Sequence, residues 1–413
     1  MAEPNCENEI ITFGCRLNAV EATAIRRAAA AAGLAGAVIV NTCAVTAEAE
    51  RQARQAVRRA RRDHPRATII VTGCAAELAP ERWAALPEID RVIGNRAKLL
   101  PESYRLSPAA AADGAAARNP SVDDLAARSR TFLQVQQGCD HRCTFCIIPF
   151  ARGPSRSVPV AAAIAEARRL CALGFREIVL TGVDLTAYGV DLPGQPRLGQ
   201  IVRQLLAAVP ELKRLRLSSL DPAEIDPELW RVFAEEERLM PHLHLSLQAG
   251  DDLVLKRMRR RHSRQDAIAV ARHARRLRPD LALGADLIAG FPTESEAMFR
   301  RSLDLVGDCG LAFLHVFPYS VRPGTAAARM PQLPPAVISE RAARLRAAGA
   351  AALAADLAAR VGQVTEVLVE GPQTGRAACY ARVDFAIAAA PGSIARMRLV
   401  ASTGHCLVGA PDR

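Results

Sequence analysis

Three cysteines stand at C-x3-C-x2-C spacing in the stretch Cys139-Asp140-His141-Arg142-Cys143-Thr144-Phe145-Cys146. Three thiolates at this spacing can hold three irons of a cubic iron–sulfur cluster and leave the fourth iron open for chemistry. Clusters that only store electrons usually have four cysteine ligands, and zinc sites usually show paired C-x2-C knuckles with further partners. No second knuckle appears in this sequence, so we expect a reactive cluster here, with zinc as the alternative.

Strand and helix patterns alternate around and beyond this stretch, from residue 131 to about residue 330. A length of about 200 residues suits six β/α units but is short for a full eightfold barrel of about 250 residues. We therefore expect an α/β domain over residues 127–333 with a partial (β/α)6 barrel. Its expected strands are residues 132–136, 177–180, 214–218, 242–248, 281–288 and 312–317.

A separate strand–helix alternation runs from residue 10 to about residue 93. It predicts βαβ units in a parallel, Rossmann-like sheet within an N-terminal domain over residues 1–106. Residues 107–126 lose this periodicity and are rich in Ala, Pro, Gly and Asp, which indicates a linker. The expected strands are residues 10–13, 37–41 and 68–72.

Cys15, Cys43 and Cys74 each follow one of these three strands. Neighbouring parallel strands end along one sheet edge, about 4.8 Å apart, so three loops can bring three cysteines to one cluster. Three unrelated buried cysteines are the alternative. Asn18 and Asn41 lie beside these loops and could bond a cluster sulfur or substrate, or serve as turn or cap residues. The cysteines without a ligand-like setting are Cys6, Cys171, Cys309, Cys379 and Cys406.

The C-terminal part of the chain differs in pattern from the rest. Residues 334–360 predict an Ala-rich helical bridge, and residues 361–413 alternate apolar and polar residues between glycine-containing breaks, as in a small antiparallel β-barrel. The formal charge of +11, from 54 basic and 43 acidic residues, favours a polyanionic partner such as RNA. The charge alone is not specific, because many soluble proteins are basic.

The first residues of the chain are polar and acidic, with neither a basic n-region nor an apolar h-region. The longest apolar run, residues 28–40, contains two glycines and is too short to cross a bilayer of about 30 Å. Eleven cysteines in a chain without an export signal indicate metal ligation rather than disulfides. We expect a cytoplasmic protein without a membrane segment.

Together these motifs resemble the radical S-adenosylmethionine (SAM) methylthiotransferase family over essentially the whole chain. The C-x3-C-x2-C loop is similar to the radical SAM signature, the three dispersed cysteines to the family's N-terminal domain, and the closing barrel to the RNA-binding TRAM domain. The resemblance implies a 4Fe-4S cluster on Cys139, Cys143 and Cys146 whose open iron chelates the amino and carboxylate groups of SAM. It also implies an auxiliary 4Fe-4S cluster on the three dispersed cysteines.

Further stretches match the family at the carboxyl ends of the expected barrel strands, where a barrel keeps its chemistry. The resemblance implies that they line the SAM pocket, because glycine permits close approach and Asp, Ser and Gln offer hydrogen-bonding groups. Taken singly, each position more often has a structural role, but as a set at successive strand ends they are hard to explain by packing alone. The implied SAM-binding residues are Gly182, Asp184, Ser219, Gln248, Asp286 and Gly290.

Two groups of arginines match the family near the active site. The first is Arg259, Arg260 and Arg261, for which we expect contacts with RNA phosphates, with a solvated basic face as the alternative. The second is Arg152, which could meet an RNA phosphate or the substrate base, or form an ion pair that stabilises the cluster loop.

The residues flanking the cysteines look most like the bacterial branch that modifies N6-threonylcarbamoyladenosine at position 37 of tRNA. These residues are 14–21, 40–46 and 143–153. The resemblance implies methylthio transfer to adenine C2, with SAM as radical source and methyl donor. The implied partners are the tRNA anticodon loop, whose base can be splayed out, a low-potential electron donor such as flavodoxin or ferredoxin, and a sulfur donor.

Four alternatives stay open at this point. Within the family, the substrate could be isopentenyladenosine 37 of tRNA or an aspartate of a ribosomal protein. Outside it, the chain could be a different radical SAM enzyme acting on a polypeptide side chain, or a non-catalytic iron–sulfur module that binds RNA or carries electrons. Retention of tRNA and formation of 5′-deoxyadenosine would separate these classes.

Overall fold

The structure, a computed structural model, describes residues 7–105 and 129–412. The predicted linker over residues 107–126 and Cys6 lie outside the described residues. Contacts group the chain into two compact units. Unit 1 is Met1–Asp124, Gly138–Pro154 and Ser320–Thr325, and unit 2 is Leu125–Gln137, Ser155–Tyr319 and Ala326–Arg413.

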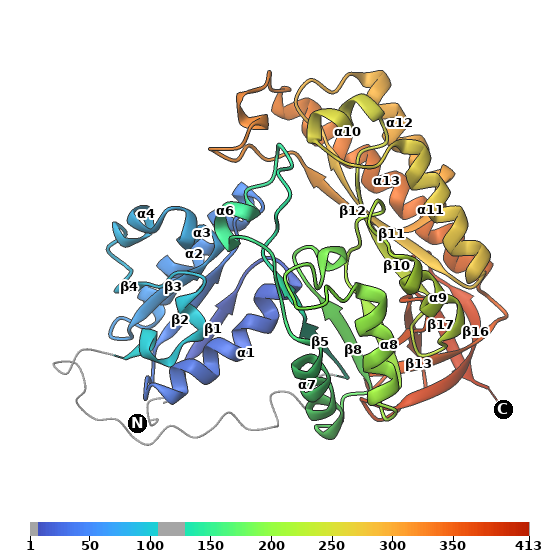
Figure 1. Ribbon diagram of the computed structural model, residues 1–413, viewed down its shortest axis with the longest axis horizontal. Helices are drawn as coiled ribbons and strands as arrows, with labels where there is room; N and C mark the ends of the chain where they lie inside the picture. The colour runs from blue at the N-terminus through green and yellow to red at the C-terminus, as the bar shows by residue number, and fades with distance from the viewer. Residues whose placement is uncertain (1–6, 106–128, 413) are drawn as a thin grey trace. The chain divides into compact units, whose positions relative to one another are not determined.

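Unit 1 is built on a four-stranded parallel sheet in the order β1-β2-β3-β4 (Figure 1). This confirms the predicted parallel α/β fold, and the first three strands lie within one residue of their expected positions. β2 and β3 are buried along their whole length, as central parallel strands usually are. The elements of unit 1 are β1 (Glu9–Thr12), α1 (Arg16–Ala31), β2 (Val38–Thr42), α2 (Ala47–Asp63), β3 (Ile69–Gly73), α3 (Cys74–Leu78), α4 (Pro80–Ala84), β4 (Arg91–Val92), the 3-10 helices η1 (Ala97–Leu99) and η2 (Pro101–Tyr104), and α6 (Ile148–Arg152).

Helix α6, which directly follows the C-x3-C-x2-C loop, belongs to unit 1 by its contacts. Ile147 and Ala151 are buried in the same apolar cluster as Val40, Cys74 and Trp83. In the sequence-based prediction this segment is part of the central domain over residues 127–333. The apolar face of α6 finds its partners on α3 and the parallel sheet, so the C-x3-C-x2-C loop belongs to the same compact unit as the three dispersed cysteines.

Unit 2 contains six parallel strands that form a partial barrel. Sheets β5-β8-β9 and β10-β11-β12 are joined by isolated parallel bridges between Leu215 and Leu239 and between Leu220 and Leu245. All pairings within the two sheets are parallel, which confirms the predicted (β/α)6 architecture. The elements are β5 (Arg130–Gln134), β6 (Gln136–Gln137), β7 (Arg156–Ser157), α7 (Val160–Ala172), β8 (Glu177–Thr181), η4 (Leu185–Ala187), α8 (Leu198–Ala208), β9 (Arg214–Leu217), α9 (Pro227–Glu235), β10 (His242–Gln248), α10 (Asp252–Met258), α11 (Arg264–Leu277), β11 (Ala282–Ala289), α12 (Glu296–Asp308), β12 (Leu311–Pro318), η5 (Ala327–Arg329) and α13 (Pro335–Ala359).

The C-terminal segment of unit 2 forms a closed five-stranded barrel in the order β13-β14-β15-β17-β16. Four of its pairings are antiparallel and the β15–β17 pairing is parallel. Closure leaves no unpaired sheet edge. The strands are β13 (Val364–Gly371), β14 (Thr374–Ala377), β15 (Arg382–Phe385), β16 (Ile394–Ser402) and β17 (Leu407–Pro411).

Buried arginines fasten this small barrel to the amino end of the partial barrel. Arg214 and Arg216 are alternate residues of β9 with exposed fractions of 0% and 1%. Arg214 donates to the carbonyl of Arg376 at 3.2 Å, and Arg216 donates to the carbonyls of Ala377 and Ala378 at 3.0 and 2.8 Å. Arginine–carbonyl bonds therefore satisfy backbone groups at the end of β14 that the docking buries.

Helix α13 lies within residues 334–360, where the sequence predicts a helix, and begins with Pro335 in its first turn, where proline fits the helix. Its Arg341 pairs with Glu294 at 2.8 Å, which holds the helix on the partial barrel. Within residues 7–105 and 129–412, no helix combines the length and apolar character needed to cross a membrane.

Candidate iron–sulfur sites

The three dispersed cysteines gather at one edge of the unit 1 sheet. Cys15 is the N-cap of α1, Cys43 directly follows β2, and Cys74 opens α3 directly after β3. Their strands are neighbours in the sheet, so all three cysteines stand at its carboxyl edge. Cys15 is exposed, while Cys43 and Cys74 are buried.

Two glycines with left-handed backbone allow these loops to approach closely. Gly14 has φ +91°, and a Cβ there would lie 2.4 Å from the sulfur of Cys43. Gly73 has φ +97°, and a Cβ there would lie 2.3 Å from the carbonyl oxygen of Thr42. Only glycine fits both the backbone and the space at these positions.

Electrostatics at this edge favour a bound cation over bare thiolates. Burial, with repulsion from Cys15 and Cys74, raises the pKa of Cys43 to about 11. A metal cluster reverses this preference, because thiolates bound to iron lose their protons. The three sulfur donors, the close backbone approach and the raised pKa therefore fit an iron–sulfur cluster.

Asn18 and Asn41 organise the cysteine loops through backbone contacts. Asn18 donates to the carbonyls of Phe13 and Thr42 at 2.7 and 3.0 Å. Asn41 donates to the carbonyl of Asn18 at 3.1 Å. Both side chains are fully buried, so they support the loops rather than reach toward a substrate.

Beneath the dispersed cysteines lies a buried ionic cluster that includes Arg152. The guanidinium of Arg152 donates to both carboxylate oxygens of Glu21, at 2.8 and 3.1 Å, and to Asn18 at 2.6 Å. The ammonium of Lys98 donates to Glu21 at 2.6 Å. With an exposed fraction of 4%, Arg152 is not positioned to contact RNA; the structure instead shows the ion pair that the sequence left as the alternative.

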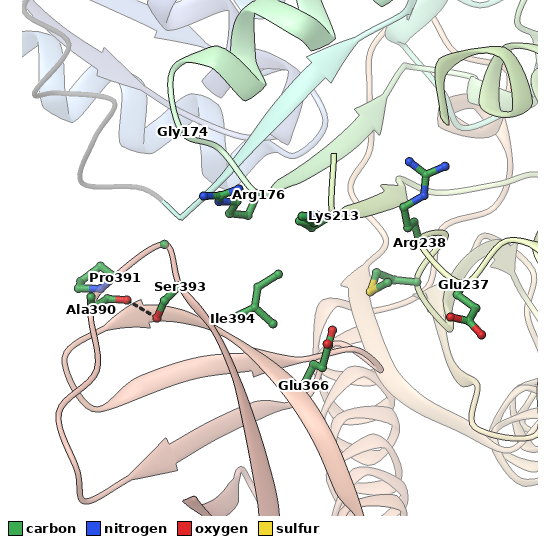
Figure 2. A pocket seen from close by; sticks show the side chains of 12 residues that line it. Gly174, Arg176, Lys213, Glu237, Arg238, Glu366, Ala390, Pro391, Ser393 and Ile394 are labelled. Carbon is green, nitrogen blue, oxygen red and sulfur yellow. Dashed lines mark hydrogen bonds between the residues drawn. The ribbon is translucent and has the colours of Figure 1, made fainter. Parts of the chain in front are cut away.

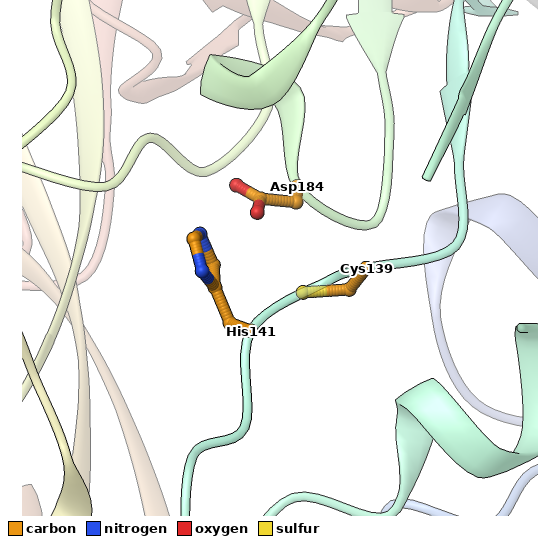
Figure 3. A group of neighbouring side chains, drawn as sticks. All are labelled: Cys139, His141 and Asp184. Carbon is orange, nitrogen blue, oxygen red and sulfur yellow. The ribbon is translucent and has the colours of Figure 1, made fainter. Parts of the chain in front are cut away.

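The C-x3-C-x2-C loop is closed at its base by a glycine. Gly138 has φ +76°, and a Cβ there would lie 1.9 Å from the carbonyl oxygen of Pro154. The amide of Cys139 donates to the carbonyl of Gly153 at 3.1 Å, which ties the two ends of the loop together. All three loop cysteines are half-buried, which leaves their sulfurs within reach of a cluster. A ring nitrogen of His141 lies within 4.8 Å of the sulfur of Cys139 (Figure 3).

In unit 2, Gly182 and Asp184 lie just beyond β8, as expected (Asp184 is drawn in Figure 3). A Cβ at Gly182 would lie 2.8 Å from the side-chain oxygen of Gln136. The same oxygen accepts from the amide of Asp184 at 2.9 Å. Gln136 on β6 thus positions the turn that carries both predicted SAM-binding residues.

Gln248 and Ser219 are half-buried near the carboxyl ends of neighbouring strands. Gln248 has φ +69°, and the register between β10 and β11 shifts just before it. Such an irregularity re-aims a side chain and is frequent next to active sites.

Asp286 on β11 sits between two histidines that sequence reasoning missed. His244 on β10 and His315 on β12 contact the same oxygen of Asp286, at 2.8 and 3.2 Å. Although burial opposes its charge, hydrogen bonds and attraction from both histidines lower the pKa of Asp286. A carboxylate held this firmly can orient its neighbours, and the two imidazoles occupy part of its hydrogen-bonding capacity.

Gly290 has a packing role in unit 2. With φ +78°, it lies against α13, and a Cβ there would lie 2.7 Å from the side chain of Ile338. Its amide donates to Glu294 at 3.1 Å. These contacts explain the glycine without a ligand.

The three consecutive arginines after α10 divide into two kinds. Arg260 donates to Asp221 at 3.0 Å and to the carbonyl of Ser246 at 2.8 Å. Arg261 donates to Asp221 at 3.0 Å and also contacts Glu224. Arg259 ends α10 with left-handed backbone and has an exposed side chain. Arg261 is exposed as well and Arg260 is half-buried, so what sets Arg260 and Arg261 apart is their bonds to Asp221.

A groove in unit 2, with a volume of about 920 Å³, lies at the amino ends of the strands (Figure 2). Arg176 and Lys213 on its rim immediately precede β8 and β9, whereas the candidate SAM residues follow strands. Glu237 and Glu366 share the groove with these basic residues. The groove has mixed charge and lies at the amino ends of the strands, whereas the candidate SAM-binding residues lie at the carboxyl ends. It is therefore not part of the candidate SAM site.

Sequence profiles of two known families match most of the chain. The Radical SAM superfamily matches residues 133–306, and the Uncharacterized protein family UPF0004 matches residues 8–94. The first match covers the C-x3-C-x2-C loop, and the second covers all three dispersed cysteines.

Two relatives resemble the chain over nearly its full length. The Threonylcarbamoyladenosine tRNA methylthiotransferase MtaB of Rickettsia prowazekii is 46% identical, over 96% of this chain and 95% of that protein. The tRNA-2-methylthio-N(6)-dimethylallyladenosine synthase of Novosphingobium aromaticivorans is 35% identical, over 96% of each chain. Among solved structures, the radical S-adenosylmethionine methyltransferase TsrM of Kitasatospora setae matches with a TM-score of 0.53 and 17% identity, covering 71% of this chain and 64% of that chain. At this identity the structural match concerns the fold alone.

Proposed function

We propose, since the chain belongs to the tRNA methylthiotransferase family of radical SAM enzymes, that it transfers a methylthio group to C2 of N6-threonylcarbamoyladenosine at position 37 of tRNA. The 46% identical relative carries the threonylcarbamoyladenosine name, whereas the 35% identical one carries the dimethylallyladenosine name. The product is 2-methylthio-N6-threonylcarbamoyladenosine.

The observation that carries this proposal is the presence of two separate sets of three cysteines in one compact unit. We assign Cys139, Cys143 and Cys146 to the SAM-binding 4Fe-4S cluster, and Cys15, Cys43 and Cys74 to an auxiliary 4Fe-4S cluster. Adenine C2 bears an unactivated C–H bond that acid–base groups do not open. The cluster that Cys139, Cys143 and Cys146 would hold would supply the electron for reductive cleavage of SAM to methionine and a 5′-deoxyadenosyl radical.

The residues of the chain itself bind and orient SAM. Gln136 fixes the turn of Gly182 and Asp184, and we assign this turn, with Ser219 and Gln248, to SAM binding. We also assign Asp286 to SAM binding, with its carboxylate oriented by the contacts to His244 and His315. Gly290 is left out of this set, because packing against α13 accounts for it.

Arg259 and Arg261 are both exposed, but Arg260 and Arg261 are bonded to Asp221. We therefore assign RNA contact to Arg259, and assign Arg260 and Arg261 to support of the loop around Asp221. A cytoplasmic reaction follows from a tRNA substrate. It also requires a low-potential electron donor, such as flavodoxin or ferredoxin, and a sulfur donor.

The decisive experiment is mass spectrometry of tRNA nucleosides from a strain that lacks the gene. We expect loss of 2-methylthio-N6-threonylcarbamoyladenosine and retention of its isopentenyladenosine counterpart. The reverse pattern would assign the chain to the other tRNA branch. Normal levels of both, with retention of a ribosomal protein but not of tRNA in a binding assay, would exclude a tRNA substrate.

A further inference from the structure

Arg152, Glu21 and Lys98 form a closed ionic cluster that the reaction described above does not use. Their side chains have exposed fractions of 1%, 1% and 0%. The ammonium of Lys98 has three acceptors: Glu21 at 2.6 Å, Asn95 at 2.8 Å and Asn41 at 3.4 Å. Three acceptors match the three protons of a charged ammonium. Burial lowers the pKa of Lys98, and attraction from Glu21 opposes this change. With the ammonium charged, the cluster holds two cations and one carboxylate, with one positive charge in excess.

This excess charge faces the dispersed cysteines. Burial alone would lower the pKa of Arg152, but attraction from Cys74, Glu21 and Cys15 raises it above its ordinary value. Lys98 also contacts Asn41, two residues before Cys43. Salt and solvent screen buried charges much less than exposed ones, so these charges act on a neighbouring site more strongly than surface charges would.

The same residues also link the C-x3-C-x2-C loop to the loop of Cys15 through side-chain bonds. Arg152 lies six residues after Cys146, and Glu21 lies six residues after Cys15. Asn95 adds a second tie, since it accepts from Lys98 at 2.8 Å and donates to the carbonyl of Ala151 at 2.7 Å. The helix after the radical SAM loop is thus bound to the helix that begins at an auxiliary cysteine.

We propose that Arg152 is a positioning residue for the auxiliary iron–sulfur cluster. It docks α6 on α1 through Glu21, and it supplies buried positive charge that offsets the negative charge of the iron–sulfur cluster. This inference rests on the auxiliary cluster of the proposed function. An oxidised 4Fe-4S cluster held by three thiolates carries one net negative charge, which the excess charge of the ionic cluster offsets. Reduction adds a further negative charge, so the buried cation makes the auxiliary cluster easier to reduce.

The test is a redox titration of the reconstituted full-length protein, followed by electron paramagnetic resonance. Repeating it in a chain with Cys139, Cys143 and Cys146 all changed to Ala identifies the auxiliary signal. Arg152→Met should shift the auxiliary reduction potential to more negative values, and Glu21→Gln should shift it to more positive values. The double variant restores the original excess charge and should return the potential toward that of the parent.

Arg61→Met is the matched control. Arg61 pairs with Asp90 at 2.6 Å, and Asp90 accepts from the amide of Ile69, at the amino end of the strand that leads to Cys74. This places the pair about 16 Å down the strand from the cysteine, at about 3.3 Å per residue. The control should leave the auxiliary potential unchanged.

The sign of the shifts separates charge from general damage. Equal potentials in all variants, or shifts of the two single variants in the same direction, would overturn the inference. If Arg152→Met does not bind the auxiliary cluster, the direction of the potential shift in Glu21→Gln still tests the inference. A parent protein that binds the iron of one cluster alone, with no signal from the dispersed cysteines, would instead contradict the auxiliary site in the proposed function.

Discussion

The ring of Tyr380 stacks on the ring of His242, with centroids 4.6 Å apart and planes 26° from parallel. Guanidinium groups of Arg130, Arg216 and Arg376 lie 5.4, 5.3 and 4.6 Å from the centroid of the same tyrosine ring. Tyr380 follows β14 of the C-terminal barrel, and His242 opens β10 of the partial barrel. One aromatic side chain therefore lies at the centre of the junction between the two barrels of unit 2.

Tyr380→Ala should weaken this junction. Removing the ring deletes the stack and three cation–π contacts, so we expect the free energy of unfolding to fall by about 2–4 kcal/mol. Calorimetry measures the loss and shows whether the C-terminal barrel then melts separately. Tyr380→Phe keeps the ring and should stay within about 1 kcal/mol of the parent. Equal losses in both variants would point to the hydroxyl instead.

Substitution of one cysteine from each set should have different effects. Cys143→Ala should abolish reductive cleavage of SAM, whereas Cys43→Ala should leave some cleavage but no methylthiolated tRNA. Anaerobic assays of 5′-deoxyadenosine and of tRNA nucleosides measure the two steps. Cleavage by Cys143→Ala at the rate of the parent would refute the assignment of the loop cysteines.

The raised pKa of Cys43 predicts slow alkylation in the metal-free protein. A thiol with a pKa of about 11 is ionised to about one part in a thousand at pH 8, and only the thiolate reacts rapidly. Iodoacetamide labelling followed by peptide mass spectrometry should find exposed Cys15 modified first. The rate at Cys43 should rise with pH up to about 11. Equal labelling of both cysteines at pH 8 would contradict the buried site.

Gly138→Ala should disrupt the base of the radical SAM loop. The added Cβ meets a backbone carbonyl, which cannot move as a flexible side chain would, so we expect a loss of several-fold in iron bound at the loop. Gly33→Ala is the control, because Gly33 has φ +74° but no atom within 4 Å of an added Cβ. Both variants carry backbone strain of about 1 kcal/mol, and only the first carries the collision. Iron analysis of both proteins decides the matter.

Asp286 should make unit 2 sensitive to acid. Its pKa is lowered in the folded state, so its carboxylate stabilises the fold above the ordinary aspartate pKa of about 3.9, and this contribution is lost as the pH falls. We expect the parent to lose about 1 kcal/mol more stability between pH 5 and pH 3 than Asp286→Asn. Urea unfolding at the two pH values measures the difference. An identical loss in both proteins would show that other groups control the acid response.

Local sequence patterns predicted the strands and the gathering of the dispersed cysteines. Alternation of apolar runs locates β1, β2 and β3, and a parallel sheet necessarily brings Cys15, Cys43 and Cys74 to the same edge. These conclusions need only neighbouring residues and a topological rule.

Contacts between distant residues could not be predicted in this way. Arg152 and Glu21 are 131 residues apart, and nothing near either one identifies its partner. The alternating Arg214 and Arg216 would normally indicate a face toward water, but this face of β9 receives the C-terminal barrel. His244 and His315 likewise meet only because β10 and β12 flank β11.

The division of unit 1 among three chain segments has a consequence for synthesis on the ribosome. Its sheet is complete early, but Gly138–Pro154 and Ser320–Thr325 emerge later, the last of these after most of the partial barrel. Arg322 from this last segment pairs with Glu50 of α2 at 3.0 Å. Domains usually fold in order as they emerge, but unit 1 cannot complete its contacts in that order. The nascent sheet therefore lacks its contacts with the two later segments, including the helix α6 that packs near Cys74, until these segments are translated.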